Sequence, residues 1–282
     1  MIASRILRRS FLTLLFSLAA TAVLAQDKPA GQEYQPEVGQ SGKDVVWVPT
    51  PQALVDKMLD LGKVTAADYV IDLGSGDGRT VITAAKRGAR ALGIEYNPDM
   101  VVLSQRNAAK EGVSGKATFT KADLFESDFS QATVITMFLL PDINLKLRPK
   151  ILGLKPGTRI VSNSFTMGEW QHDRSVQVTE GEGCQSYCTA YLWIVPAKVG
   201  GSWNLAEGEL TLKQSFQMIT GTLRAGGKET PIKGRLSGDQ ISFKAGSAQY
   251  SGRVSADGIK GTVKSGGGTG DWSATRTSRA AS

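Results

Sequence analysis

Residues 70–79, Val-Ile-Asp-Leu-Gly-Ser-Gly-Asp-Gly-Arg, constrain the fold more than any other part of the chain. The apolar beginning of this segment has the composition of a buried strand, and the glycines that follow mark a tight turn. Residues 79–87 then show helical periodicity and end at Gly88. A strand that passes through a glycine-rich turn directly into a helix is typical of α/β proteins that bind a nucleotide-like ligand at the turn.

The same alternation of strands and helices continues along the chain. We expect strands at residues 69–73, 91–95, 117–120, 132–139 and 159–165, and helices at residues 79–87, 98–110 and 143–154. An earlier amphipathic helix follows Pro51, with Thr50 as its N-cap. Two more strands, at residues 175–179 and 187–195, have no helix between them and are expected to form an antiparallel hairpin at one sheet edge. The fold class is therefore α/β, with a Rossmann-like sheet of seven strands.

The chemistry of the glycine turn favours S-adenosylmethionine (SAM) over a dinucleotide. The dinucleotide fingerprint has its third glycine where this chain has Arg79. The turn also carries Asp72 and Asp77, which would repel a pyrophosphate. SAM has an ammonium and a sulfonium group instead, and carboxylates attract both. Gly74 and Gly76 let the backbone approach the methionine part of the ligand.

Two further acidic residues stand at the ends of expected strands. Glu95 ends the second strand, about 20 residues after the glycine turn, where an acid accepts hydrogen bonds from ribose hydroxyls. NAD enzymes share that feature, but Asp123 after the third strand is placed to accept from the adenine amine. Together these elements predict a SAM-dependent methyltransferase. We expect SAM to be bound by Asp72, Gly74, Ser75, Gly76, Asp77, Glu95, Tyr96, Asp123 and Leu124.

Residues 45–175 carry a series of motifs that resemble one enzyme family. The motifs are Pro-Thr-Pro at residues 49–51, the turn at residues 72–79, and the segments at residues 84–89, 93–95, 123–125, 139–141, 147–150, 154–159 and 161–162. In these the chain resembles the mitochondrial ATP-synthase c-subunit and adenine-nucleotide-translocase lysine methyltransferases, and more distantly the non-SET histone lysine methyltransferases. The resemblance implies N-methylation of a lysine side chain.

The resemblance also directs attention to residues 138–144, the loop after the fourth strand. Related N-methyltransferases line the channel for the acceptor amine from this loop. An apolar channel helps lysine to lose its proton, because desolvation disfavours the ammonium form. A neutral amine then needs mainly positioning, so we assign no general base. Candidate acceptor-site residues, for which packing or helix capping is the alternative, are Trp47, Thr50, Leu140, Pro141 and Asn144.

Three other polar or aromatic residues carry separate expectations. Asn163 and Trp170 follow the fifth strand near the same sheet edge and are weaker acceptor-site candidates. His172 is expected in a surface loop and not in catalysis. Because it is the only histidine, the chain has too few soft ligands for a zinc centre, and the same scarcity argues against a Ser-His-Asp hydrolase. We expect no metal.

The N-terminal residues have the pattern of an export signal. Arg5, Arg8 and Arg9 precede an apolar stretch at residues 11–25, which ends in Val-Leu-Ala. We expect a signal peptide at residues 1–25, with an uncleaved anchor or a mitochondrial presequence as alternatives. The arginine pair resembles a twin-arginine signal, whose pathway carries folded proteins. Residues 26–44 are expected to form a flexible lead-in, and the protein is expected to be periplasmic or secreted.

The two cysteines, Cys184 and Cys188, lie four positions apart. In an oxidising compartment such a pair suggests a disulfide, which requires a turn because extended chain would hold the residues about 13 Å apart. Two free thiols or, less readily, a metal site are the alternatives.

The pattern changes at Pro196, so residues 45–197 are expected to form the methyltransferase domain and residues 200–277 a second one. The second domain shows short alternating runs at residues 209–212, 215–223, 230–236, 240–244, 248–254, 258–263 and 270–274. They predict a small all-β domain, a meander closing into a barrel. From Gly200 the chain has 11 Lys and Arg against 6 Asp and Glu. A solvated surface is the simplest account of this positive charge. A surface that binds acidic lipid, polysaccharide or nucleic acid is the alternative.

Three functions remain open from the sequence. The first is a methyltransferase for a protein lysine, and the second is one for a small molecule or a lipid. The third is a non-catalytic exported SAM-binding protein. SAM is made in the cytosol, which conflicts with export unless the chain folds and loads SAM before crossing. We expect no nucleic-acid partner and no stable membrane span after signal cleavage.

Overall fold

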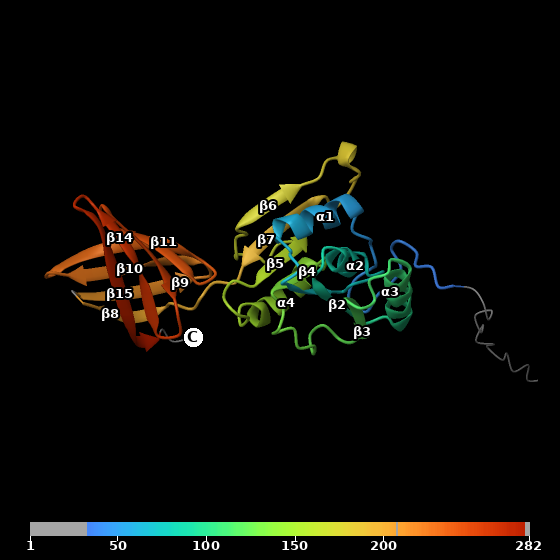
Figure 1. Cartoon of the computed structure of the whole chain (residues 1–282), viewed down its shortest axis with the longest axis horizontal. Coiled ribbons are helices and arrows are strands. Elements are labelled where there is room, and N and C mark those ends of the chain that lie inside the picture. Colours follow the sequence, from blue (N-terminus) through green and yellow to red (C-terminus); the bar gives the residue numbers. More distant parts are fainter. Residues whose placement is uncertain (1–32, 207, 280–282) are drawn as a thin grey trace, which may run out of the picture. The chain divides into compact units, whose positions relative to one another are not determined.

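The computed structural model describes residues 33–206 and 208–279. The expected signal peptide and residues 26–32 of the expected lead-in lie outside the described residues. Within the part that is described, no helix is both long and apolar enough to cross a membrane. The described chain contains an α/β domain followed by an all-β domain (Figure 1).

The α/β domain is built on a seven-stranded sheet with strand order β3-β2-β1-β4-β5-β7-β6. Strands β1 to β5 run parallel, and β7 pairs antiparallel with both β5 and β6 at one edge. The strands are β1 Tyr69–Leu73, β2 Arg90–Glu95, β3 Ala117–Lys121, β4 Val134–Met137, β5 Arg159–Asn163, β6 Arg174–Gln177 and β7 Thr189–Ile194. The Rossmann-like sheet and its antiparallel edge hairpin are thereby confirmed.

Helices pack on both faces of this sheet (Figure 1). They are α1 Gln52–Leu61, α2 Arg79–Lys86, α3 Pro98–Lys110 and α4 Pro141–Ile151, with a short 3₁₀ helix, η1, at Glu180–Glu182. Successive side chains of β1 point to opposite faces. Val70 packs in a cluster with residues of α1, α2 and α3, whereas Ile71 packs in a cluster with residues of α4. The chain order reverses between β1 and β4, and ligands bind in such sheets beyond the carboxyl ends of the strands at this point.

Several predicted boundaries are wrong by a few residues. The fourth strand is limited to β4, and helix α4 begins at Pro141 and ends at Ile151 instead of spanning residues 143–154. Thr50 does not cap α1. Pro51 holds the N-cap position without a side-chain bond, and the Thr50 hydroxyl accepts a hydrogen bond of 3.2 Å from Nδ2 of Asn163 instead. This buried amide on β5 offers Thr50 a partner that the helix end does not.

The C-terminal domain is a closed antiparallel barrel, which confirms the predicted all-β barrel. It has eight strands, one more than the seven expected. The strands are β8 Gly201–Leu205, β9 Gly208–Ser215, β10 Met218–Ala225, β11 Lys228–Ser237, β12 Gln240–Ala245, β13 Ala248–Val254, β14 Gly258–Ser265 and β15 Gly268–Arg279. The missed strand, β8, closes the barrel between β15 and β9.

One expected barrel strand, at residues 215–223, is divided in two by a turn. The chain reverses at Phe216 and Gln217, between β9 and β10. Phe216 takes a left-handed conformation there, with φ of 52°. Phenylalanine is not among the residues that favour turns, so the sequence pattern does not predict this turn.

The barrel interior is filled by side chains. Its core includes Trp203, Leu210, Ile219, Phe243 and Ile259, which alternate with outward-facing polar residues along their strands. At Gly221 an added Cβ would lie 1.8 Å from the carbonyl oxygen of Thr211 on the neighbouring strand. Only glycine permits so close an approach of two strands, which lets the sheet bend into a closed barrel.

Candidate cofactor and acceptor site

A pocket lies at the carboxyl ends of β1, β2 and β4. Its walls come from the β1–α2 turn, the end of β2, the residues after β3 and the loop after β4. These segments are separated in sequence, but parallel strands bring their carboxyl ends to one sheet edge. The pocket is lined by all nine residues expected to bind SAM, namely Asp72, Gly74, Ser75, Gly76, Asp77, Glu95, Tyr96, Asp123 and Leu124.

The glycine turn between β1 and α2 has a backbone that other residues rarely adopt. Gly74, Gly76 and Gly78 have φ values of 76°, 54° and 84°. Gly76 is also crowded, because a Cβ on it would meet Nε1 of Trp47 at 2.7 Å. A side chain at this position would therefore be strained and would displace the indole that lines the pocket.

Asp72 is a buried carboxylate without a cationic partner among the described residues. It lies on β1 with 6% of its surface exposed, and the hydroxyl of Thr136 donates a hydrogen bond of 2.6 Å to its Oδ1. Burial raises the pKa of Asp72 to about 7; the Thr136 hydrogen bond opposes this rise, and the charges of Glu95 and Asp77 add to it. A buried acid of this kind fits a ligand that brings its own positive charge, as SAM does.

Asp77, the second acid of the turn, is neutralised within the chain. The Arg79 guanidinium donates to Asp77 through Nη2, with a distance of 2.6 Å to Oδ2. Nη1 of Arg79 also donates to the carbonyl of Thr50 at 2.8 Å. The expected attraction of Asp77 for a cationic ligand is therefore weakened, and its carboxylate fixes the turn to the segment before α1.

Glu95 is held in place by backbone groups at the end of β2. Its Oε2 accepts from the amide of Gly76 at 2.9 Å, and its Oε1 accepts from the amide of Asn97 at 2.9 Å. Each carboxylate oxygen has two lone pairs, so both retain capacity for another donor. Glu95 therefore links the glycine turn to β2 and can still accept from ribose hydroxyls.

Asp123 forms an ion pair with Lys43 and accepts from the amide of Phe125 at 2.8 Å. The Lys43 ammonium holds the pKa of Asp123 below its ordinary value. Lys43 also lies 4.9 Å from the centre of the Tyr96 ring. A flexible polar segment was expected to end at residue 44, but residues 40–44 line the pocket. The amide of Trp47 donates to the carbonyl of Gln40, which folds the segment back on itself.

The acceptor-site candidates divide into two groups. Trp47, Thr50 and Leu140 line the pocket, whereas Pro141 and Asn144 do not. Pro141 is the first residue of α4. Asn144 is fully buried and donates through Nδ2 to the carbonyls of Phe165 at 3.4 Å and Thr166 at 3.2 Å. Asn144 therefore lies away from the pocket lining, and its amide ties α4 to the loop after β5.

The weaker candidates also lie away from the pocket lining. Asn163 is buried and donates to Thr50, and Trp170 is fully buried against Trp193. His172 lies half-buried in a loop, with its ring centre 4.8 Å from that of Tyr191. None of the three lines the pocket.

An aromatic wall lines part of the same pocket as the residues expected to bind SAM. It consists of Phe138, Phe165 and Tyr187, whose ring centres lie 5.2 to 6.0 Å apart. Phe138 belongs to the predicted acceptor loop. Phe165 and Tyr187 were not expected at the site. For Tyr187 the sequence does contain a signal, because it lies between two closely spaced cysteines.

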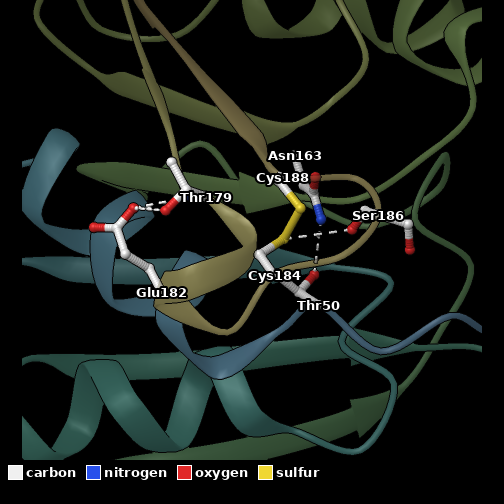
Figure 2. The surroundings of a disulfide bond; sticks show 7 residues. All are labelled: Thr50, Asn163, Thr179, Glu182, Cys184, Ser186 and Cys188. Atoms are coloured by element: carbon white, nitrogen blue, oxygen red, sulfur yellow. Dashed lines mark hydrogen bonds between the residues drawn. A yellow bond between two sulfur atoms is a disulfide. The ribbon is translucent and has the colours of Figure 1, made fainter.

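Cys184 and Cys188 form a disulfide, which decides among the alternatives left open by their spacing. Figure 2 shows the bond beside the Thr50–Asn163 hydrogen bond, and on its other side the Thr179–Glu182 capping box of η1. The bond closes the loop that carries Tyr187.

Comparisons with known proteins agree with this geometry. The family model of the ANTKMT methyltransferase domain matches residues 72–174. A protein-lysine N-methyltransferase from Saccharolobus islandicus (strain REY15A) is 43% identical over 154 residues, which are 54% of this chain and 94% of that protein. The ATP-synthase c-subunit lysine N-methyltransferase of Homo sapiens is 39% identical over 40% of this chain. This chain spans about half of that human protein, 48% of its length.

A solved structure is similar over the same part of the chain. It is titled an RNA methyltransferase from Salinibacter ruber in complex with S-adenosyl-L-homocysteine, and it is 47% identical with a TM-score of 0.50. The alignment covers 54% of this chain and 96% of that one. Its bound ligand is the product that SAM leaves after methyl transfer. With nearly the whole Saccharolobus enzyme matched at this level of identity, the chain belongs to the family of that enzyme and is a SAM-dependent methyltransferase.

Proposed function

We propose that the protein methylates the side-chain amine of lysine in a protein substrate. The observation that carries this proposal is the aromatic wall, which lines the same pocket as the cofactor-binding turn. SAM, when bound, supplies an electrophilic methyl group on its sulfonium. Relatives whose names specify a lysine acceptor support the same choice.

The wall suits an amine that arrives as an ammonium ion and must react as a free base. Aromatic faces attract a cation, and so they favour entry of a lysine side chain. The same apolar surroundings then disfavour the charged form and help the proton to leave. Phe138, Phe165 and Tyr187 carry no carboxylate, imidazole or amine, so these residues act by orienting the acceptor and excluding water.

The residues of the cofactor half have separate tasks. Asp72 and Glu95 present acceptors to the groups of SAM that carry hydrogen and positive charge, as their strand-end positions indicate. Leu140 and Trp47 also line the pocket and add to its apolar surface. Binding therefore brings a neutral amine and the methyl group together without a dedicated base.

Methyl transfer to defined acceptors tests this proposal. The purified protein is incubated with SAM labelled in its methyl group and with a mixture of random peptides, each with one central lysine. The matched control mixture has arginine in place of lysine. We expect label in methyllysine after acid hydrolysis and none with the control mixture. Asp72→Ala should abolish both SAM binding and transfer, which assigns the activity to this site.

The same assay includes the other acceptor classes. Total RNA is included because the Salinibacter structure is titled an RNA methyltransferase. A lipid extract and a metabolite extract cover smaller acceptors. Label confined to one of these would move the proposal away from lysine. Tight SAM binding without transfer to any acceptor would instead support a non-catalytic SAM-binding protein.

We also infer that the protein acts outside the cytosol. The arginine-rich start of the sequence supports export, and the Cys184–Cys188 disulfide suits an oxidising compartment. Export of the folded chain with SAM already bound would supply the cofactor. Fractionation of cells that produce the full chain tests the inference: we expect the protein in the exported fraction, with SAM or its demethylated product bound. Recovery only from the cytosol, with both cysteines reduced, would overturn it.

A further inference from the structure

The loop of residues 183–188 lies outside residues 72–174, the part of the chain that the family model matches. It joins η1 to β7 and is closed by the disulfide between its first and last cysteines. Between them, Tyr187 reaches the pocket. The loop therefore adds a residue to a site whose other parts come from the carboxyl edge of the parallel strands and from the segment before α1.

Both ends of this loop are firmly attached to the domain. Cys184 is 2% exposed and packs in a cluster with Leu54 and Met58 of α1 and with residues of β5 and β7. The amide of Val178 donates to the carbonyl of Cys188 at 2.9 Å. The disulfide therefore acts mainly on the conformation of residues 185–187, which lie between the two cysteines.

Tyr187 has a backbone conformation that its surroundings must enforce. Its φ of 55° is left-handed, a region that L-residues with a side chain rarely adopt because Cβ comes too close to the following carbonyl oxygen. The residue is 46% exposed, yet its ring centre lies 5.2 Å from that of Phe138 and 5.9 Å from that of Phe165. Strained backbone conformations cluster at active sites and ligand-binding sites, so the strained, half-exposed Tyr187 at this pocket is a candidate binding residue.

The geometry points to Tyr187 as a specificity-determining residue of the acceptor site, held in the aromatic wall by the Cys184–Cys188 disulfide. This inference rests on the proposed lysine transfer. It adds that the position of Tyr187 in the pocket depends on the redox state of the two cysteines. The acceptor side chain packs its methylene groups on the Tyr187 ring while its amine enters the pocket. None of the nine cofactor-binding residues belongs to the loop, so SAM binding does not depend on it.

Reduction is the natural way to release this residue. Two electrons and two protons from a dithiol reductant such as dithiothreitol convert the disulfide into two thiols, and the reductant closes into its own cyclic disulfide. The loop then no longer has a covalent restraint that holds Tyr187 in its left-handed conformation. The ring leaves the wall, and the acceptor loses one of its three aromatic contacts.

The test measures acceptor kinetics and SAM affinity separately, with the lysine-centred peptide mixture as acceptor. Tyr187→Ala should raise KM for the peptides at least fivefold and leave SAM affinity within twofold of the unchanged protein. Tyr187→Phe keeps the ring and should restore most of the peptide affinity that Tyr187→Ala loses. Dithiothreitol should lower kcat/KM of the unchanged protein by at least fivefold. It should have no further effect on Tyr187→Ala, because disulfide and ring act through one contact.

The outcomes separate this inference from the proposed function. If the unchanged protein binds SAM but transfers no methyl group to lysine peptides, the proposed function is wrong and the inference falls with it. If transfer occurs and Tyr187→Ala behaves as the unchanged protein, only the inference is wrong. A further loss when Tyr187→Ala is reduced would show that the disulfide acts through another part of the chain. SAM affinity and the thermal melting curve of each variant establish that it is folded.

Discussion

The hydroxyl of Thr136 donates a 2.6 Å hydrogen bond to the carboxylate of Asp72, from the position directly opposite it on the neighbouring parallel strand. Thr136 is fully buried and Asp72 is 6% exposed. The pair lies where the strand order of the sheet reverses, between β1 and β4. One hydrogen bond does not offset the burial of a carboxylate, so the charge on Asp72 depends on what binds beside it.

Binding of SAM is expected to release a proton from Asp72 below neutral pH. The pKa of Asp72 is raised to about 7, so the carboxyl group of the ligand-free protein is mostly neutral at pH 6. A cation bound nearby favours the ionised form and lowers this pKa. Calorimetric titration with SAM at pH 6, in buffers of different ionisation enthalpy, should show release of close to one proton per site.

The Asp72→Asn variant is the control for this measurement. SAM has a titratable amino group of its own, and its contribution is the same in both proteins. The difference in proton release between the unchanged protein and Asp72→Asn should therefore be large at pH 6 and small at pH 8.5. An equal difference at both pH values would contradict the account of Asp72.

The same residue makes the stability of the ligand-free protein depend on pH. An aspartate of the unfolded chain loses its proton near pH 4, whereas Asp72 in the folded protein keeps it until about pH 7. Between these values the folded state binds more protons, so the contribution of Asp72 to stability falls as pH rises through this window. The full loss is at most about 4 kcal/mol, from about 1.4 kcal/mol per pKa unit.

Urea unfolding at several pH values from 5 to 8, without SAM, measures this loss. The unchanged protein should lose free energy of unfolding between pH 5 and 8 relative to Asp72→Asn, whose amide does not titrate. The two proteins should differ most in slope near pH 5.5, about midway between the unfolded and the folded pKa of Asp72. Parallel curves would show that Asp72 titrates with an ordinary pKa in the folded protein.

The cofactor half of the site follows from the sequence because it depends on regular structure. Asp72, Glu95 and Asp123 stand at or just after the carboxyl ends of successive expected strands, and parallel pairing brings such ends to one edge. Strand periodicity and turn glycines are local signals, so the nine expected residues could be named without knowledge of any tertiary contact.

The other half depends on contacts that no local pattern encodes. Lys43 reaches Asp123 across 80 residues of sequence, and Tyr187 meets Phe138 only because the edge hairpin and the loop after β4 lie together. Asn144 lies near the start of a helix beside the site but does not line the pocket, because its amide is directed to backbone carbonyls of the loop after β5. Which polar groups need a partner is decided by tertiary packing.

Substitution of Gly76 should separate backbone strain from steric conflict in the cofactor turn. Gly76 and Gly112 both have a positive φ, of 54° and 68°. A Cβ on Gly76 would meet Nε1 of Trp47 at 2.7 Å, whereas nothing lies within 4 Å of a Cβ on Gly112. Alanine costs about 1 kcal/mol of strain at either position. Only Gly76→Ala must also displace the pocket-lining indole.

We therefore expect Gly76→Ala to weaken SAM binding at least tenfold, measured by calorimetric titration. Gly112→Ala should bind SAM within twofold of the unchanged protein. Its free energy of unfolding should fall only by the cost of the backbone strain, about 1 kcal/mol. If both variants bind SAM equally well, Trp47 and the turn do not form the cofactor surface described above.

The barrel is closed by a side chain as well as by backbone pairing. Strand β15 pairs with β8, and the register of the two shifts between Arg276 and Ser278. Arg276 is nearly buried, with 6% of its side chain exposed. Its guanidinium donates to the carbonyls of Gly200 at 3.1 Å and Lys198 at 2.6 Å, and its Cζ lies 4.0 Å from the centre of the Trp203 ring.

Arg276→Ala should consequently destabilise the barrel far more than removal of a surface arginine. The substitution removes the cation that binds the carbonyls of Gly200 and Lys198 and packs on the Trp203 ring. We expect this loss to lower the free energy of unfolding by about 3 kcal/mol. The matched control is Arg253→Ala on β13, whose side chain is 69% exposed and pairs with Asp239. An exposed pair of this kind contributes less than about 1 kcal/mol. Urea unfolding followed by tryptophan fluorescence compares the two variants. Equal losses would mean that strand pairing alone closes the barrel, because the buried guanidinium would then contribute no more than an exposed one.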